Sequence, residues 1–217
     1  MDLKLGAKNM SSELDPRIMK TKQQLKRALI KLLSKQSTQS LSIQQITETA
    51  EITRGTFYLH YHDKQDFIQT IVNDFVTDFF QCALVDAKSS LNEKMVVSEH
   101  TVHAFSLGKG FKYMADNYQV FMVLFGLVGE NNFTEKIKLG FHHYLDTFFE
   151  SLELKENLQS ANIKVEADFV IAGLLGIMQE WLSGGGVYSP RFVSNKMYNL
   201  IRTKSTAVVG VSDFFVK

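Results

Sequence analysis

Residues 53–60 carry side chains whose types could read the edges of DNA bases. Arg54 can donate two hydrogen bonds to O6 and N7 of a guanine. Gly55 allows the backbone to come close to a groove wall. Tyr58 offers a flat apolar face to a thymine methyl group and a hydroxyl to a phosphate. Gln44, in the segment before them, joins these three residues as a candidate for base readout.

The same part of the chain supplies short or cationic hydrogen-bond donors that could hold DNA phosphates. We expect that role for five residues: Ser42, Thr53, Thr56, His60 and Lys64. Taken singly, Arg54, Tyr58 and Lys64 could each be an ordinary solvated side chain. The prediction therefore depends on the segment as a whole.

Helices are expected to position these side chains. Asp15 followed by Pro16 is an N-cap acceptor with proline at the first helical position, so a first helix should begin there. The polar residues 34–40 end it. Ser42 with Gln45 three residues later has the form of a capping box and should open a second, short helix.

A third helix is expected from Thr53 to about His60. Phe57 and Tyr61 lie one turn apart there and should pack inward, against the first helix. Two short helices joined by a tight turn, with a third bracing them, form the helix-turn-helix arrangement, whose second helix enters the major groove.

Residues 15–67 resemble the DNA-binding domain of TetR/AcrR-type regulators. The resemblance is most specific in the run from Thr53 to Lys64, and its matching residues are Asp15-Pro16-Arg17, Thr21, Ala28, Leu32-Leu33, Leu41-Ser42-Ile43, Ile46, Ala50, Ile52-Thr53-Arg54-Gly55-Thr56-Phe57-Tyr58, His60-Tyr61 and Asp63-Lys64. The family usually has glycine where this chain has Glu51. If that turn needs a left-handed residue, Glu51 costs about 1 kcal/mol there.

The composition favours an all-α protein. Its 217 residues are 45% hydrophobic and include only two prolines, while apolar residues recur at spacings of three and four. The single cysteine, Cys82, leaves no disulfide framework, the first residues lack a signal-peptide pattern, and residues 169–181 are too short to span a bilayer. We therefore expect a cytoplasmic protein with no membrane partner.

The charge is divided unevenly along the chain. Residues 1–65 hold 11 Lys or Arg and 6 Asp or Glu, whereas residues 66–217 hold 13 and 17. A basic head on an acidic body suits a polyanion-binding module joined to a second domain. We expect a flexible arm at 1–14, a helix-turn-helix domain at 15–62, a helical domain at 63–204 and a tail at 205–217.

Six further helices are expected in the second domain, which makes about nine in the whole chain. They are expected at residues 63–88, 93–116, 118–128, 133–154, 164–183 and 190–203. The resemblance implies that they form an effector-binding and dimerisation domain. Residues 173–182 look like the eighth helix of such regulators, which pairs with its copy in a dimer. The interface residues expected on this basis are Gly173, Gly176, Ile177 and Trp181.

The middle helices are rich in aromatic and Met side chains, which can line an apolar effector pocket or form a packed core. The pocket candidates are Phe105, Met114, Phe121, Met122, Phe125, Phe141, Tyr144, Phe148 and Phe169. On family grounds a pocket for a small, apolar effector is expected among them. The pairs His100/His103 and His142/His143 lack the ligands that would complete a metal site, so neither a metal nor another cofactor is expected.

The resemblance implies a homodimeric repressor that binds palindromic, double-stranded operator DNA and is released by its effector. The helix expected at residues 63–88 would link the two domains. One alternative is an architectural or partner-regulated DNA-binding factor without an effector. The other, a small helical enzyme, is disfavoured because the chain has no Walker A loop, nucleophile elbow, HExxH or paired-Cys motif.

Overall fold

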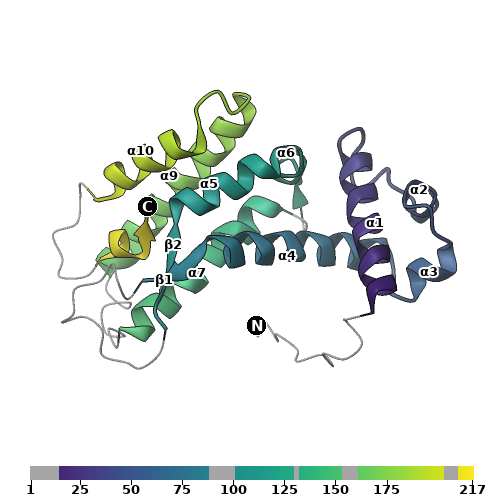
Figure 1. The fold of residues 1–217 in the computed structure, drawn as a ribbon, viewed down its shortest axis with the longest axis horizontal. Helices are drawn as coiled ribbons and strands as arrows, with labels where there is room; N and C mark the ends of the chain where they lie inside the picture. Colours follow the sequence, from purple (N-terminus) through teal and green to yellow (C-terminus); the bar gives the residue numbers. More distant parts are fainter. Residues whose placement is uncertain (1–14, 88–100, 130–131, 153–160, 203–209) are drawn as a thin grey trace. The chain divides into compact units, whose positions relative to one another are not determined.

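The computed structural model describes residues 15–87, 101–129, 132–152, 161–202 and 210–217. These residues form nine α-helices and three short strands (Figure 1). The chain divides into two compact units, one up to Ile71 and one from Val72 onward. The arm expected at residues 1–14 and the first part of the tail, residues 205–209, lie outside the described residues.

The N-terminal unit consists of α1 (Pro16–Leu33), α2 (Ile43–Thr49), α3 (Arg54–Tyr58) and the first turns of α4 (Lys64–Ala83). As expected, Asp15 caps α1: its carboxylate accepts a hydrogen bond from the Arg17 amide at 2.9 Å, and Pro16 occupies the first turn. The unit is held together by buried apolar residues from all four helices, including Leu25, Ile46 and Phe57.

An aromatic cluster joins α3 to α4. The ring of Phe57 lies 5.3 Å from that of Phe67, and the ring of Tyr61 lies 4.9 Å from Phe67. All three side chains are buried, so the first two turns of α4 belong to the N-terminal unit. The division therefore falls within α4 rather than before residue 63, because the packing of Phe67 continues the core beyond the end of α3.

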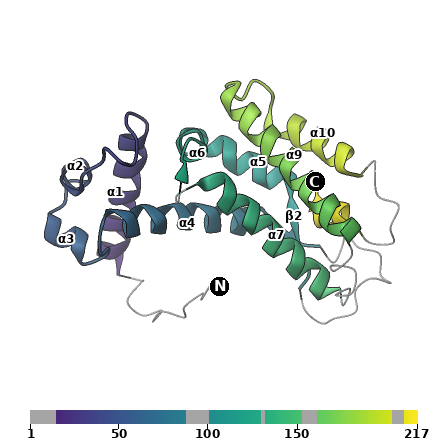
Figure 2. The same ribbon diagram turned by 180° about the vertical axis from the view of Figure 1, so that it is seen from behind.

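The C-terminal unit contains the rest of α4, then α5 (Leu107–Asp116), α6 (Tyr118–Phe125), α7 (Phe133–Ser151), α9 (Ala161–Ser183) and α10 (Pro190–Arg202). Helix α10 packs along α5, and α7 packs against α9; Figure 2 shows the latter pair from behind.

A three-stranded sheet is the part of this unit that the sequence did not indicate. Strand β1 (Leu84–Asp86) pairs antiparallel with β2 (His103–Ser106), and β2 pairs parallel with β3 (Phe215–Val216). The helices expected over 63–88 and 93–116 are therefore wrong at 84–86 and 103–106. A strand needs partners, and these partners lie far apart in the sequence, where local periodicity cannot detect them.

The described end of the chain is part of the core rather than a loose tail. Residues Val211–Phe214 form a 3-10 helix, and Val211, Phe214 and Phe215 are fully or almost fully buried. Ser106 donates a hydrogen bond to the carbonyl oxygen of Lys217 at 2.8 Å, which fixes the end of β3 beside β2.

Candidate DNA-binding surface

Helices α2 and α3 are both capped by their own side chains. Ser42 and Gln45 form the expected capping box. The backbone N–H of Gln45 donates to Ser42 Oγ, and the backbone N–H of Ser42 donates to Gln45 Oε1. The hydroxyl of Thr53 accepts from the Thr56 amide at 3.0 Å and starts α3. The observed α3 is shorter than the helix expected over 53–60 and ends at Tyr58.

The turn between α2 and α3 has one residue in the left-handed region. Glu51 has φ 57° and is the one non-glycine residue with positive φ in the described part of the chain. Because the left-handed region costs an L residue about 1 kcal/mol or more, the turn is strained at Glu51, the position at which the sequence departs from the resemblance described above. Ile52 closes the turn by donating to the Thr47 carbonyl at 3.0 Å.

The residues proposed for base readout lie on the surface of this motif. Gln44, Arg54, Gly55 and Tyr58 are exposed, whereas Phe57 points inward and is fully buried. A Cβ atom built on Gly55 would meet only Thr53 Oγ1, at 3.6 Å. The surface over Gly55 is therefore open, as a close approach of DNA would require.

Arg54 and Gln44 contact one another. Arg54 Nη2 donates to Gln44 Oε1 at 2.8 Å, and Gln44 Nε2 donates to Glu48 Oε1 at 2.9 Å. Residues from the two helices of the motif are therefore joined by side-chain hydrogen bonds on one exposed surface. Sequence reasoning missed Glu48, although its i, i+4 spacing from Gln44 on α2 is a visible signal.

Leu59 is a second residue that sequence reasoning missed. It follows directly after α3 and is 82% exposed, next to Tyr58 at 55%. Two large exposed apolar side chains at the end of a short helix could contact thymine methyl groups or sugars. The signal in the sequence was its position beside Tyr58, on the solvent side of the buried Phe57.

Lys64 is engaged within the protein. Its ammonium donates to the carbonyl oxygens of Leu41 at 2.8 Å, Thr38 at 3.1 Å and Gln39 at 3.2 Å. An ammonium has three donors, and all three are used here. The phosphate role expected for Lys64 is therefore replaced by a structural one, which anchors the loop before α2.

His60 is half-buried at the end of the motif. Burial, with a smaller contribution from the nearby charge of Lys22, lowers the pKa of the His60 imidazole from its ordinary value of 6.5. The free protein therefore holds His60 in its neutral form at pH 7. A neutral imidazole can still donate one hydrogen bond to a phosphate, but it brings no charge.

The expected effector-pocket residues do not share one environment. Phe105, Met114, Phe121, Phe141 and Phe148 are buried, and Phe105 and Phe141 stack edge-on at 4.8 Å. Phe125 and Tyr144 are half-buried, while Met122 is 41% and Phe169 65% exposed. Met122 and Phe169 are therefore corrected to surface positions, because they lie on the outer sides of α6 and α9.

The aromatic core packs tightly against glycines. A Cβ on Gly110 would come within 2.7 Å of the Phe105 ring, and one on Gly140 would clash with the Phe80 ring. The ring of Phe80 also lies 5.0 Å from that of Phe141. The predicted pocket residues on α5 and α7 are thus part of a packed core in this structure.

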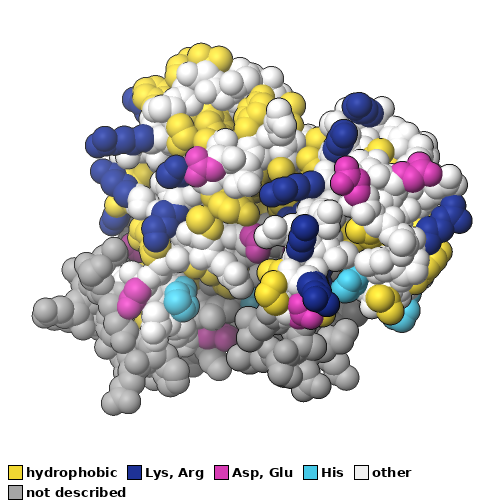
Figure 3. Space-filling view, turned by 45° about the vertical axis from the view of Figure 1, so that its right-hand side comes forward, with side chains coloured by type: hydrophobic (Ala, Val, Ile, Leu, Met, Phe, Trp, Pro, Cys, Tyr) yellow, Lys and Arg dark blue, Asp and Glu magenta, His cyan; other side chains and the backbone are white. Residues whose placement is uncertain are grey.

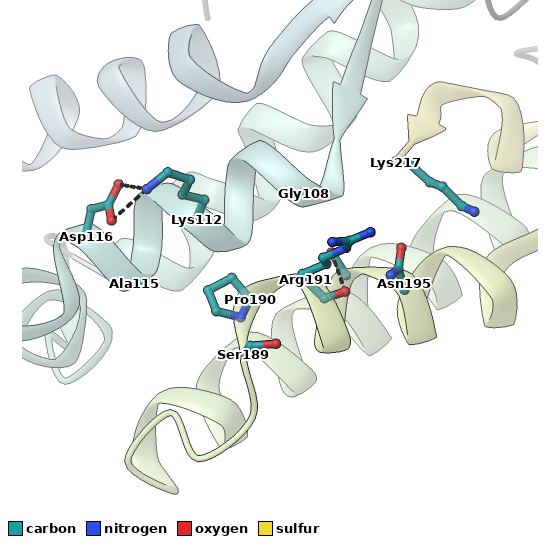
Figure 4. A pocket seen from close by; sticks show the side chains of 10 residues that line it. Gly108, Lys112, Ala115, Asp116, Ser189, Pro190, Arg191, Asn195 and Lys217 are labelled. Carbon is teal, nitrogen blue, oxygen red and sulfur yellow. Dashed lines mark hydrogen bonds and ion pairs between the residues drawn. The ribbon is translucent and has the colours of Figure 1, made fainter.

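A cavity of about 600 Å³ lies elsewhere in the C-terminal unit, between α5 and α10 (Figure 4). None of the nine expected pocket residues borders it. Small residues form part of its wall, and Arg191, Asn195 and Lys217 stand along its rim. Lys112 is paired with Asp116 at 2.9 Å, so the groove carries a net positive charge within an acidic part of the chain.

The predicted interface residues on α9 divide into two groups. Gly173, Gly176 and Ile177 lie on the exposed side of the helix, and Cβ atoms on the two glycines would meet nothing within 4 Å. Trp181 instead packs inside its own unit, with its ring 5.5 Å from Phe111 and its Nε1 donating to the Tyr188 carbonyl at 2.8 Å. Trp181 is therefore corrected to a core residue.

Apolar side chains are exposed on α9 and on the neighbouring α10. Val165 is 68% exposed and Ile177 40%, and Phe192 on α10 is 46% exposed. Figure 3 shows hydrophobic side chains (yellow) gathered at the upper left of that view, while Lys and Arg side chains (dark blue) are spread over both units.

The described residues contain neither a cluster of metal ligands nor a helix that could span a membrane. Among them, no group of three or more His, Cys, Asp or Glu residues could hold a metal ion. His142 lies 3.2 Å from the Asp168 carboxylate, and His100 is outside the described residues. In the same part of the chain no helix is long and apolar enough to cross a bilayer.

Two family models match the sequence. The model described as "Bacterial regulatory proteins, tetR family" matches residues 26–71, which hold the C-terminal part of α1, all of α2 and α3, and the start of α4. The model described as "Transcriptional regulator C-terminal region" matches residues 104–203. The two matches fall on opposite sides of the division within α4.

A curated relative is an uncharacterised HTH-type transcriptional regulator, YxbF of Bacillus subtilis, 24% identical over 209 residues. The match covers 94% of this chain but about half the length of that relative.

Similar solved structures include the dihydroxyacetone kinase operon activator DhaS, with a TM-score of 0.55 at 17% identity, covering 85% of this chain and 95% of that one. The fatty acid degradation regulator FadR from Bacillus halodurans has a TM-score of 0.55 at 16% identity, covering 83% and 94%. At these identities the likeness concerns the fold alone.

Proposed function

Because this chain belongs to the TetR family of bacterial transcriptional regulators, we propose that it binds double-stranded operator DNA through α2 and α3 as a ligand-released repressor. One observation carries the proposal: α2 and α3 are fixed by their own caps while Arg54, Gln44 and Tyr58 face solvent. Rigid helices with exposed hydrogen-bonding side chains suit readout in a major groove.

Within this surface we assign base contacts to Arg54 and Tyr58, with Gly55 allowing close approach. Ser42, Thr53, Thr56 and His60 are assigned to phosphates. The Ser42 hydroxyl donates to Gln45 Oε1, and the hydroxyls of Thr53 and Thr56 share a hydrogen bond, but all three residues lie at the starts of α2 and α3, where we expect a DNA strand to pass. Lys64 is left out of this set because its three donors are bound to carbonyls.

We further propose a homodimer formed through the exposed face of α9. Val165, Gly173, Gly176 and Ile177 fall on one side of that helix, and the glycines leave room for a second helix to approach closely. A two-fold dimer presents two copies of α3 and matches a palindromic operator with half-sites about one DNA turn apart.

The effector is proposed to bind in the C-terminal unit, and the groove between α5 and α10 is our candidate for its site. A cavity of about 600 Å³ is in the range that accommodates small ligands. The guanidinium of Arg191 at its rim favours a small organic anion, while the Lys217 ammonium lies 5.2 Å from the centre of the Tyr198 ring. The aromatic cluster on α5 and α7 would take an apolar effector only if its rings moved.

Helix α4 supports a route for release, because its residues up to Ile71 belong to the N-terminal unit and those from Val72 to the C-terminal unit. A ligand that favours one orientation of α4 would change the spacing of the two α3 helices. A switch from mostly bound to mostly free requires about 5 kcal/mol of differential ligand affinity. A cytoplasmic location follows from the proposed access to DNA.

The first test is fluorescence anisotropy with the DNA that flanks the protein's own gene, against a scrambled duplex, at two salt concentrations. Tight, salt-sensitive binding to the flanking DNA alone supports an operator-binding regulator. Equal binding to both duplexes would favour an architectural factor. No binding to either would contradict the DNA-binding role and reopen the enzyme and partner-protein hypotheses.

The effector proposal is tested separately. A panel of small organic anions is screened by thermal shift, and hits are added to the protein–DNA complex. We expect a hit to raise the melting temperature of the native chain, to release DNA, and to do neither with Arg191→Ala. A ligand that stabilises both proteins equally would exclude the α5–α10 groove as its site.

A further inference from the structure

Three side chains on the DNA-binding surface form a chain of hydrogen bonds, which we call the Glu48–Gln44–Arg54 relay. Gln44 Nε2 donates to Glu48 Oε1 at 2.9 Å, and Arg54 Nη2 donates to Gln44 Oε1 at 2.8 Å. All three residues are exposed. The relay begins on α2, crosses the turn and ends at the first residue of α3.

Glu48 determines the orientation of the Gln44 amide. An ionised carboxylate can only accept hydrogen bonds, so the amide must turn its NH₂ group toward Glu48. Its carbonyl oxygen then faces Arg54 and can accept from the guanidinium. The flipped amide would point its NH₂ group at the Arg54 guanidinium and its carbonyl oxygen at the Glu48 carboxylate, so Glu48 and Arg54 favour the same orientation of Gln44.

The relay leaves Arg54 able to read a base. A guanidinium has five N–H donors, and the bond to Gln44 uses one of them. Two of the remaining donors are enough for the paired contact with O6 and N7 of guanine. The bond to Gln44 removes rotational freedom from a long side chain that would otherwise be ordered only on binding DNA.

The side-chain amide of Gln44, which the sequence suggested for base readout, makes hydrogen bonds within the protein instead. Both groups of its amide are already engaged, one by Glu48 and one by Arg54. A bidentate contact with adenine needs the same two groups. The bonds to Glu48 and Arg54 use one of its two N–H donors and one of its two acceptor sites, so a contact with adenine would have to fit the donor and acceptor that remain.

We propose that Glu48 and Gln44 are positioning residues that set the base preference of Arg54. This inference rests on the proposed DNA-binding function and deepens it. Glu48 makes no base contact itself; its carboxylate acts through Gln44, and its negative charge near the phosphates weakens binding to all duplexes alike. Glu48 therefore favours specificity at a cost in affinity.

The test begins with the full-length chain and a library of random DNA duplexes, from which the bound sequences are selected. The same selection with Arg54→Ala identifies the base pair that Arg54 reads, because that position alone should lose its preference. Duplexes with G·C or A·T at this position are then used to measure the affinity ratio for each variant by fluorescence anisotropy.

Glu48→Ala should lower the preference for guanine at the Arg54 position by about three- to tenfold, a part of the discrimination that a bidentate pair supplies. Gln44→Ala should do the same. Glu48→Gln keeps an acceptor oxygen for Gln44 and should retain most of the preference, while its lost charge strengthens binding to scrambled DNA. In the Arg54→Ala background, Glu48→Ala should change the base preference no further.

Glu51→Ala is the matched control. It removes an equal charge three residues away on the same surface, outside the relay, and should leave the preference at the Arg54 position unchanged. A melting temperature measured for every variant separates loss of positioning from loss of fold.

Three results would overturn the relay. One is an unchanged guanine preference in Glu48→Ala. Another is a Glu48→Ala effect that persists without Arg54, which would mean direct readout by Glu48. The third is a Gln44→Ala effect at a different base pair, which would make Gln44 a reader. If the native chain selects no sequence at all, the proposed function itself fails, which is a distinct outcome.

Discussion

The ammonium of Lys64, at the first residue of α4, lies 2.8 Å from the carbonyl oxygen of Leu41, 23 residues earlier in the chain. The same ammonium also binds the carbonyls of Thr38 and Gln39. Since Leu41 directly precedes the N-cap of α2, these bonds fix the loop from which the DNA-binding motif begins. A cation that the sequence assigns to a phosphate thus orders the surface that would meet the DNA.

Replacing Lys64 by alanine should therefore act on stability first. The change leaves three carbonyls, two of them partly buried, without their charged donor, and we expect the free energy of unfolding to fall by about 2 kcal/mol. Urea denaturation followed by circular dichroism measures this value. Lys35→Ala, at an exposed position of the same unit, is the control and should change stability little. If Lys64→Ala leaves stability unchanged, the structural role of Lys64 is contradicted and a contact with a DNA phosphate is favoured instead.

Glu51 offers a substitution that should stabilise the protein. Its φ of 57° is strained for an L residue and relaxed for glycine. Glu51→Gly should raise the free energy of unfolding by up to about 1 kcal/mol, because relief of the strain exceeds the entropy that glycine adds to the unfolded chain. Glu51→Ala keeps the strained backbone and should show no such gain. A loss of stability in Glu51→Gly would mean that the Glu51 side chain makes a stabilising contact.

The sequence predicts the N-terminal unit well because its determinants are local. The Asp15 cap with Pro16 and the Ser42–Gln45 capping box each involve residues within four positions of one another. The predicted first turn of α3 at Thr53 is confirmed in the same way. The inward position of Phe57 follows from helical phase alone.

The C-terminal unit exceeds what local patterns can predict. Phe105 reads as a helix residue, yet it pairs in register with Leu84 on one side and Phe215 on the other. No window of the sequence contains all three strands. The contacts of Lys64 could not be predicted for a similar reason. Its carbonyl partners lie more than 20 residues away, and backbone carbonyls leave no signature in the sequence.

His60 should make stability depend on pH. Burial lowers the pKa of its imidazole in the folded protein, whereas the unfolded chain keeps the ordinary value of 6.5. The unfolded state therefore takes up the proton first as the pH falls. The stabilisation from neutral His60 is complete above pH 6.5 and is lost as the pH falls from there to the lower, folded-state pKa.

The free energy of unfolding measured between pH 5 and pH 8 tests this dependence. His60→Gln should flatten the acid side of the curve, while His62→Gln, an exposed histidine two residues away, serves as the comparison. The idea fails if the His60→Gln curve keeps the full slope of the native chain. A phosphate placed against His60 would raise the imidazole pKa, so operator binding should tighten as the pH falls through this range.

The exposed face of α9 makes the oligomeric state testable with one charge. Ile177 is 40% exposed beside Gly173 and Gly176, whose surfaces are open. In a two-fold interface, Ile177→Asp places like charges near each other and buries them, so dimer affinity should fall at least about tenfold. Operator affinity should fall with it, because each α3 then binds its half-site alone. Sedimentation velocity over a concentration series measures the first effect.

Leu139→Asp adds the same charge at an exposed apolar position on α7, outside the proposed face, and should leave the dimer intact. A dimer that persists in Ile177→Asp would place the interface elsewhere on the chain. A native chain that sediments as a monomer at all concentrations would contradict the proposed dimer. The argument for a palindromic operator, which depends on that dimer, would then fail as well. If Ile177→Asp is monomeric and still binds the operator with native affinity, dimerisation does not contribute to DNA recognition. A dimer on two half-sites would then bind no more tightly than a monomer on one.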